Sequence, residues 1–80
     1  MHERPTIVAA VRRERRALGK RLRAIREERR LTQQEAAEII GVHPVTLARI
    51  EAGQSNVTLA TLTAISLAYD VTLSAMFSLR

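Results

Sequence analysis

LTQQEAAEIIGVHPVTLARIEAG, residues 31–53, has the pattern of two short helices joined by a tight turn, and the rest of the chain is interpreted around it. Thr32 and Glu35 form a capping box, in which a hydroxyl and a carboxylate three residues apart satisfy free amides at a helix start. Gly41 ends the first helix, because the residue just past a helix often has a positive φ, which glycine adopts without a Cβ penalty. This stretch therefore predicts a helix, a turn and a second helix.

The second helix is expected over residues 44–51. His43 is its predicted N-cap and Pro44 its first residue, because a proline there loses no helical hydrogen bond and already has a helical φ. Leu47 and Ile50 are three residues apart and are expected to face inward. The residues left on the exposed side are Pro44, Val45, Ala48 and Arg49.

Three segments, LRAIREERRLTQQEAA, GVHPVTLARIEAG and NVTLATLTAISLAYDVTLSAMF, resemble the Cro/lambda-repressor-like (XRE-type) helix-turn-helix family in their order and spacing. The resemblance covers about three quarters of the chain. It implies an all-α fold, a five-helix lambda-repressor-like DNA-binding domain, here with an N-terminally extended first helix. Residues 1–16 are then a basic N-terminal arm and helix extension, and residues 17–80 the helix-turn-helix domain.

In this family the domain binds double-stranded DNA, and the resemblance implies a transcription regulator, most simply a dimeric repressor or autoregulator at a palindromic operator. Base-edge contact is expected from His43, Pro44, Val45 and Arg49. Phosphate contact is expected from Gln33, Thr46, Gln54, Ser55 and Asn56. Arg49 is the strongest base reader, because a guanidinium can bind guanine bidentately, although a salt bridge to a nearby acid is the alternative. His43 is more readily the N-cap of the second helix than a residue that contacts bases. Val45 offers an apolar contact to a thymine methyl.

The resemblance also implies a structural salt bridge between Arg26, on the first helix, and Glu51, near the end of the second helix of the motif. Loss of one partner would leave a partly buried charge without its counterion.

Basic residues are concentrated at the N-terminal end of the chain. Residues 1–30 hold eleven Lys and Arg against four Glu, a net charge of +7, whereas residues 31–80 carry −2. Such a block favours a polyanion partner through counterion release, and a solvated helix face is the alternative. A long first helix is expected from about Thr6 to Arg29, with residues 1–5 as an arm. The apolar Ile7, Val8 and Val11 would suit a second subunit or another protein.

Two further helices complete the predicted domain. Thr58 is the expected N-cap of the fourth helix, and the last helix is expected from Thr72 to about Ser78. Leu59, Leu62, Ile65 and Tyr69 are expected on one face of the fourth helix, and Leu73, Met76 and Phe77 are the apolar contributors of the last. Leu67, with Ala64 and Ala75, makes these helices apolar enough to favour a homodimer, unless Leu67 is an ordinary exposed leucine.

Several classes of function are disfavoured by composition. The chain has no cysteine, hence neither a disulfide nor a thiolate metal site, which fits a reducing cytoplasm. No apolar run approaches the roughly 20 residues of a membrane span. An enzyme is not expected, and neither a cofactor nor a metal is implied. The alternatives left open are an antitoxin that binds a toxin, a restriction-modification controller protein, and an RNA-binding protein that uses its arginine-rich helix.

Overall fold

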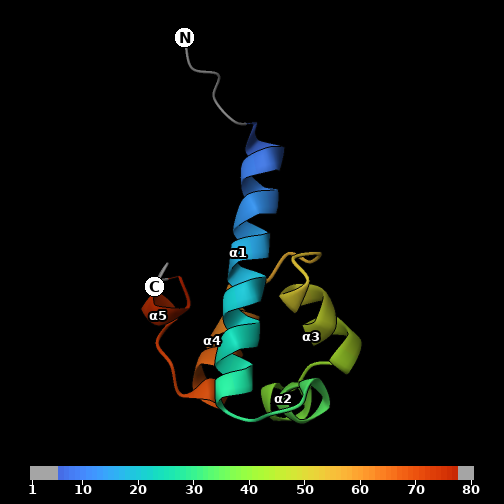
Figure 1. Ribbon diagram of the computed structural model, residues 1–80, viewed down its shortest axis with the longest axis vertical. Helices are drawn as coiled ribbons and strands as arrows, with labels where there is room; N and C mark the ends of the chain where they lie inside the picture. The colour runs from blue at the N-terminus through green and yellow to red at the C-terminus, as the bar shows by residue number, and fades with distance from the viewer. Residues whose placement is uncertain (1–5, 78–80) are drawn as a thin grey trace.

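Five helices form the part of the chain that the structure, a computed structural model, describes: residues 6–77 (Figure 1). The helices are α1 Ile7–Glu28, α2 Gln33–Ile40, α3 Pro44–Glu51, α4 Leu59–Tyr69 and α5 Leu73–Met76. No strand occurs within this range. The predicted all-α, five-helix fold with a long first helix is confirmed. The expected arm at residues 1–5 and the end of the last helix at Ser78 lie outside the described residues.

Side-chain caps begin every helix. Thr6, Thr32, Thr58 and Thr72 each accept a hydrogen bond from the backbone amide three residues later. The amide of Thr32 in turn donates to Oε1 of Glu35 over 2.9 Å, which completes the predicted capping box. This backbone hydrogen bond is the main reason that the pKa of Glu35 lies below its ordinary value. The starts of the helices are therefore fixed by hydrogen bonds between residues no more than three positions apart.

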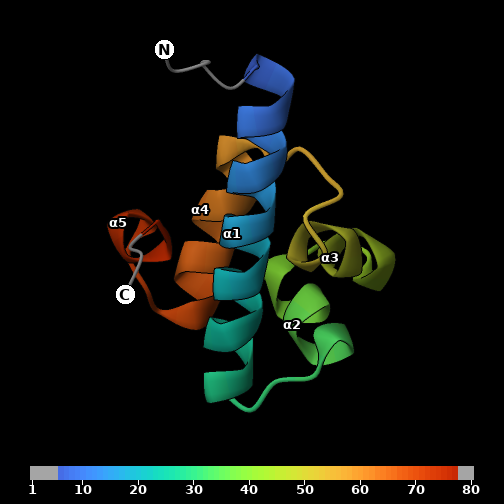
Figure 2. The same cartoon turned by 45° about the horizontal axis from the view of Figure 1, so that its top comes forward.

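Left-handed residues follow four of the helices: Gly41 and Asp70 are the C-caps of α2 and α4, and Arg30 and Gly53 lie one residue beyond the C-caps of α1 and α3. Gly41 follows α2 with a φ of 90°, and Asp70 follows α4 with a φ of 54°. Aspartate tolerates this conformation better than most residues. These two residues redirect the chain, so that α3 and α5 return toward α1 (Figures 1 and 2).

One hydrophobic core lies between the C-terminal half of α1 and the other four helices. Its fully buried large side chains are Leu22, Leu47, Ile65, Tyr69 and Met76. The first buried residue of α1 is Gly19, so about three turns of this helix precede the core and project beyond it (Figure 1). Among residues 6–77, no helix combines the length and the apolar character needed to span a membrane.

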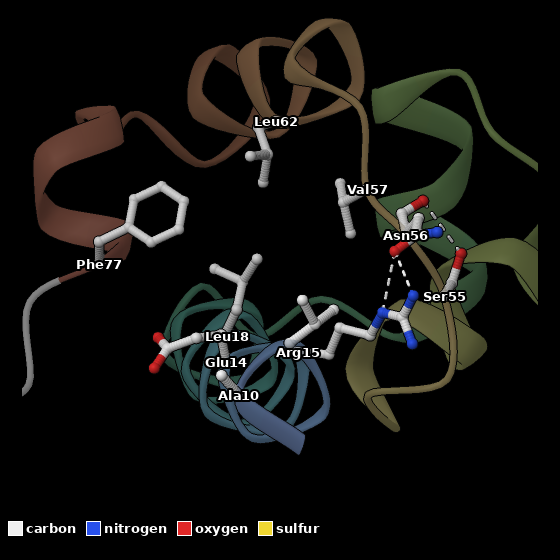
Figure 3. A pocket seen from close by; sticks show the side chains of 10 residues that line it. Ala10, Glu14, Arg15, Leu18, Ser55, Asn56, Val57, Leu62 and Phe77 are labelled. Atoms are coloured by element: carbon white, nitrogen blue, oxygen red, sulfur yellow. Dashed lines mark hydrogen bonds between the residues drawn. The ribbon is translucent and has the colours of Figure 1, made fainter. Parts of the chain in front are cut away.

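Two apolar residues expected on the last two helices lie at the surface. Leu59 is 68% exposed and Phe77 is 56% exposed. Leu59 is the first residue of α4, and helical side chains point back toward the N-terminus, so Leu59 extends past the core that Leu62 enters one turn later. Phe77 follows the four-residue α5 and lies at the rim of a surface hollow (Figure 3).

Two arginines, Arg21 within α1 and Arg29 at its C-cap, tie the C-terminal helices to the core, a role that the sequence did not reveal. Arg21 donates from Nε to the carbonyl oxygen of Ala75 over 2.9 Å. Arg29 donates in the same way to the carbonyl oxygen of Tyr69, also over 2.9 Å. Both acceptors lie near helix C-termini, where carbonyl groups lack helical partners. Part of the basic character of α1 is therefore structural.

Tyr69, the single tyrosine, is expected to make the fold less stable at alkaline pH. Its hydroxyl is buried without a hydrogen-bond partner among residues 6–77, and burial, with a smaller effect of the Glu51 carboxylate, raises its pKa to about 12. Since the fold holds the neutral phenol, its contribution is fully present below pH 10 and is lost as pH rises through 12. We expect a loss of about 2 to 3 kcal/mol, measured by urea unfolding at increasing pH.

Tyr69→Phe is the matched control, because it keeps the ring and removes the titrating group. The free energy of unfolding of Tyr69→Phe should not fall in this way at alkaline pH. At pH 7 it should equal or exceed that of the parent, because the substitution removes an unpaired buried hydroxyl. The same alkaline loss in both proteins would contradict this account of Tyr69.

Candidate nucleic-acid interface

The two sides of α3 differ in exposure. Leu47 and Ile50 are buried against the core, whereas Val45, Thr46 and Arg49 are exposed. Pro44 and Ala48, also predicted for the outer side, are half-buried. The guanidinium of Arg49 makes no ion pair with any acid in residues 6–77, which removes the proposed salt bridge as an explanation within that range. The helix therefore presents an unpaired cation on its outer side.

His43 acts as a helix cap. Its Nδ1 accepts a hydrogen bond from the backbone amide of Val45 over 3.1 Å, and the exposed imidazole lies next to Pro44 at the start of α3. Pro44 has no amide hydrogen to donate. The start of α3 thus offers an imidazole edge and an apolar surface rather than a set of donors.

A buried ion pair fixes the end of α3 to α1. Arg26 donates from Nε to Oε2 of Glu51 over 2.7 Å and from Nη2 to Oε1 over 3.0 Å, and the two residues are only 8% and 7% exposed. The hydrogen bond to Glu51 is the main reason that the pKa of Arg26 lies above its ordinary value. The pair expected from the family resemblance is present, and its two parallel bonds fix direction as well as distance.

Gln33 joins this ion pair. Its Nε2 donates to Oε1 of Glu51 over 3.0 Å, so the amide group links the start of α2 to the end of α3. The sequence suggested a phosphate-binding role for Gln33 and did not suggest this contact. The half-buried side chain lies at the N-terminus of α2, where free backbone amides favour an anion. Phosphate contact by Gln33 stays a prediction.

The loop between α3 and α4 is held by Arg15, a contact that the sequence did not reveal. Oδ1 of Asn56 accepts hydrogen bonds from Nε of Arg15, over 3.0 Å, and from its Nη2 (Figure 3). Gln54 and Asn56 are exposed and Ser55 is half-buried. Because Arg15 occupies the carbonyl oxygen, the amide hydrogens of Asn56 are the donors that this side chain can offer outward.

Two glycines bring α1 and the end of α3 into backbone contact. A Cβ added at Gly19 would lie 2.5 Å from the carbonyl oxygen of Glu51 and 2.6 Å from that of Ile50. A Cβ added at Gly53, whose φ is 74°, would lie 2.9 Å from Cα of Arg16. An isolated glycine within a helical pattern is the signal that would have pointed to Gly19. The position of α3 is thus set by backbone atoms on α1.

An apolar hollow of about 340 Å³ lies beside the loop, between α1, α4 and α5 (Figure 3). Its apolar walls include Val11, Leu18, Val57, Leu62 and Phe77. Residues 6–77 contain no cluster of three or more His, Cys, Asp or Glu that could hold a metal ion. The residues predicted to contact nucleic acid lie on the outer side of α3, at the start of α2 and in the loop of residues 54–56.

Comparisons with known proteins agree with this geometry. A family model described as "Helix-turn-helix" (HTH_3) matches residues 22–76. The structure is similar to the restriction-modification controller protein C.AhdI from Aeromonas hydrophila, with a TM-score of 0.80 and 28% identity over 81% of this chain and 98% of that chain. No curated protein matches the sequence significantly.

Two longer regulators share the same structure in part. The HTH_3 family transcriptional regulator from Vibrio cholerae aligns with a TM-score of 0.79 and 30% identity over 84% of this chain and 38% of that chain. The clp gene regulator ClgR from Corynebacterium glutamicum aligns with a TM-score of 0.75 and 31% identity over 78% of this chain and 66% of that chain. The chain spans less than half of the Vibrio cholerae regulator.

Proposed function

The chain belongs to the HTH_3 helix-turn-helix family, and from this premise we propose that it is a transcription regulator that reads double-stranded DNA through α3. Family membership and the regulators of similar structure support DNA binding and transcription regulation. The proposed sequence reading is supported by the placement of Arg49, on the side of α3 opposite the buried Leu47 and Ile50. Arg49 is exposed and forms no ion pair within residues 6–77. The proposed activity is binding, not catalysis.

Base reading in this proposal relies on few polar groups. Arg49 binds a guanine through O6 and N7, and Val45 contacts a thymine methyl. Pro44 seats the helix in the groove without donating, and His43 adds a ring edge while it caps α3. With so few base-directed donors, the shape of the duplex supplies part of the specificity.

Phosphate contacts in this proposal flank the reading helix on both sides. Gln33 and the free amides of the α2 N-terminus lie on one side. The loop lies on the other, where the hydrogen bond from Arg15 positions Asn56. The proposed phosphate-contacting residues are Gln33, Thr46, Gln54, Ser55 and Asn56.

A homodimer at a palindromic operator completes the proposal. Leu67 is 79% exposed on α4, and the half-buried Ala64 and Ala75 lie on α4 and α5. An isologous contact between two copies would bury this apolar surface and give the two-fold symmetry that paired half-sites require. In this arrangement the protein acts as a cytoplasmic repressor or autoregulator.

The second candidate is a restriction-modification controller protein, and the similarity to C.AhdI over 98% of its length favours it. An antitoxin is the other variant of the proposal, in which α1 also binds a toxin. Ile7, Val8 and Val11 are the exposed apolar residues available to such a protein partner. Both variants retain DNA reading by α3.

Arg49→Ala tests the proposed function. Duplexes selected by the parent protein from a random pool supply the cognate sequence, and affinities for this sequence and for an unrelated duplex are then measured by fluorescence anisotropy. We expect a loss of about 1 to 3 kcal/mol for the cognate duplex, roughly 5- to 150-fold, and little change for the unrelated one.

Arg13→Ala is the matched control, because it removes the same charge from an exposed position on α1. It should change both affinities by the same small factor. Equal losses on both duplexes for Arg49→Ala would show that Arg49 contacts phosphate alone. A parent protein that selects no duplex would overturn the proposed function itself.

A further inference from the structure

The first three turns of α1 have no role in the core. No residue before Gly19 is buried, yet the helix is continuous from Ile7. Arg12 and Arg16 are one turn apart, as are Arg16 and Lys20, and like charges at this spacing destabilise a helix by about 0.2 to 0.5 kcal/mol per pair. The segment is helical and exposed, and its positive charges repel one another. These properties suit binding to a negatively charged partner.

This segment of α1 lies against the loop between α3 and α4. Arg15 bonds to Asn56, and the backbone of Arg16 contacts Gly53 at the start of the loop. The turns of α1 that precede Arg15 extend past this crossing, away from the core (Figures 1 and 2). The extension therefore begins at the loop that the proposed function places on phosphate.

The basic residues around α1 fall into two groups by direction. At about 100° per residue, Arg12 and Arg16 lie within roughly 60° of Gly19, the residue that contacts the end of α3. Arg13 and Lys20 lie roughly 100° to 120° from Gly19, on the outer side of α1. All four are exposed, and none forms an ion pair with another residue of the range 6–77. Arg12 and Arg16 are thus the free cations on the side of α1 nearer to α3.

We infer that this side of the α1 extension, defined by Arg12 and Arg16, is a second DNA-binding surface that contacts the phosphate backbone flanking the sequence read by α3. The inference rests on the proposed function, because α3 and the loop place the duplex. Charge complementarity selects the partner: guanidinium groups suit phosphate geometry, and each neutralised phosphate releases condensed counterions. The surface adds affinity and lengthens the footprint without reading bases.

The test compares two double variants that remove the same charge. Arg12→Gln/Arg16→Gln changes the side nearer to α3, and Arg13→Gln/Lys20→Gln changes the outer side. Affinity for one cognate duplex with long flanks is measured from 50 to 200 mM salt. We expect the first variant to reduce the slope of log affinity against log salt by about 1.8, which is roughly a 10-fold smaller loss of affinity across this range, and the second to change it little.

Shortening the duplex flanks gives an independent readout. The parent should lose affinity when the flank next to α1 is removed, and Arg12→Gln/Arg16→Gln should not. Circular dichroism checks that both variants keep the helix content of the parent, as expected for exposed glutamines, which favour helix.

Each contrary result has a distinct meaning. Equal slope reductions in the two variants would show that α1 acts on DNA only through its overall positive charge. They would overturn the proposed contact of Arg12 and Arg16 with phosphate. Unchanged slopes in both would assign the arginines to solvent or to another partner, such as an acidic protein, and would also overturn it. If Arg49→Ala still separates cognate from unrelated DNA in either case, the proposed function stands while this inference fails.

Discussion

Replacing Glu51 by glutamine is expected to lower the free energy of unfolding by about 3 to 5 kcal/mol. The substitution keeps the size of the side chain and removes its charge, so Arg26, which is only 8% exposed, is left without a counterion. Burying an unpaired cation costs far more than the loss of one hydrogen bond. For a domain of 80 residues this is a large part of the total stability.

Urea unfolding followed by circular dichroism measures this loss, and Glu38→Gln is the control. Glu38 is exposed on α2, so removing its charge should change stability by no more than about 0.5 kcal/mol. The double variant Arg26→Met/Glu51→Gln should recover much of the loss, because it removes the stranded charge as well. A double variant less stable than Glu51→Gln would show that Arg26 acts mainly through its hydrogen bond to the carbonyl oxygen of Leu31.

Gly19→Val is expected to lower the free energy of unfolding by about 3 kcal/mol or more. Its Cβ would lie 2.5 Å and 2.6 Å from two backbone carbonyl oxygens at the end of α3, and backbone atoms cannot move aside as a flexible side chain can. Overpacking of this kind commonly costs about 1 to 3 kcal/mol, and valine adds two methyl groups to the clash. The end of α3, with Arg49, would be pushed away from α1.

Gly19→Ala separates two opposing effects by the sign of the change in stability. Alanine is favoured over glycine within a helix by about 1 kcal/mol, so helix propensity alone predicts a more stable protein. The contact with α3 predicts a less stable one. Ala17→Val, at an exposed position of the same helix, measures the cost of valine without the clash. An alanine variant more stable than the parent would show that α1 and α3 separate easily at this crossing.

The sequence predicted most of what local chemistry determines. The caps at Thr32, His43 and Thr58 and the left-handed end at Gly41 are confirmed, because each depends on a few neighbouring residues. The inward placement of Leu47 and Ile50 is also confirmed, since helical periodicity fixes which residues share a face.

Features that depend on the placement of whole helices could not be predicted in the same way. The apolar stripe of α4 included Leu59, because periodicity cannot tell where the neighbouring helices stop. The bonds of Arg15, Arg21 and Arg29 join residues at least 40 positions apart in the chain. The link from Gln33 to Glu51 likewise needs the angle between α2 and α3. The assignments of the DNA-contacting residues, and the division at residues 16 and 17, stay predictions.

The separation of the two sides of α3 has an evolutionary consequence. Leu47, Ile50 and Glu51 hold the helix in place, while Val45 and Arg49 make no contribution to the buried core. Outward positions can therefore drift or be exchanged without endangering the scaffold. Under the proposed function, a duplicated copy of this gene could acquire a new target sequence through a few substitutions, and its descendants would form a set of regulators with one architecture and different target sequences.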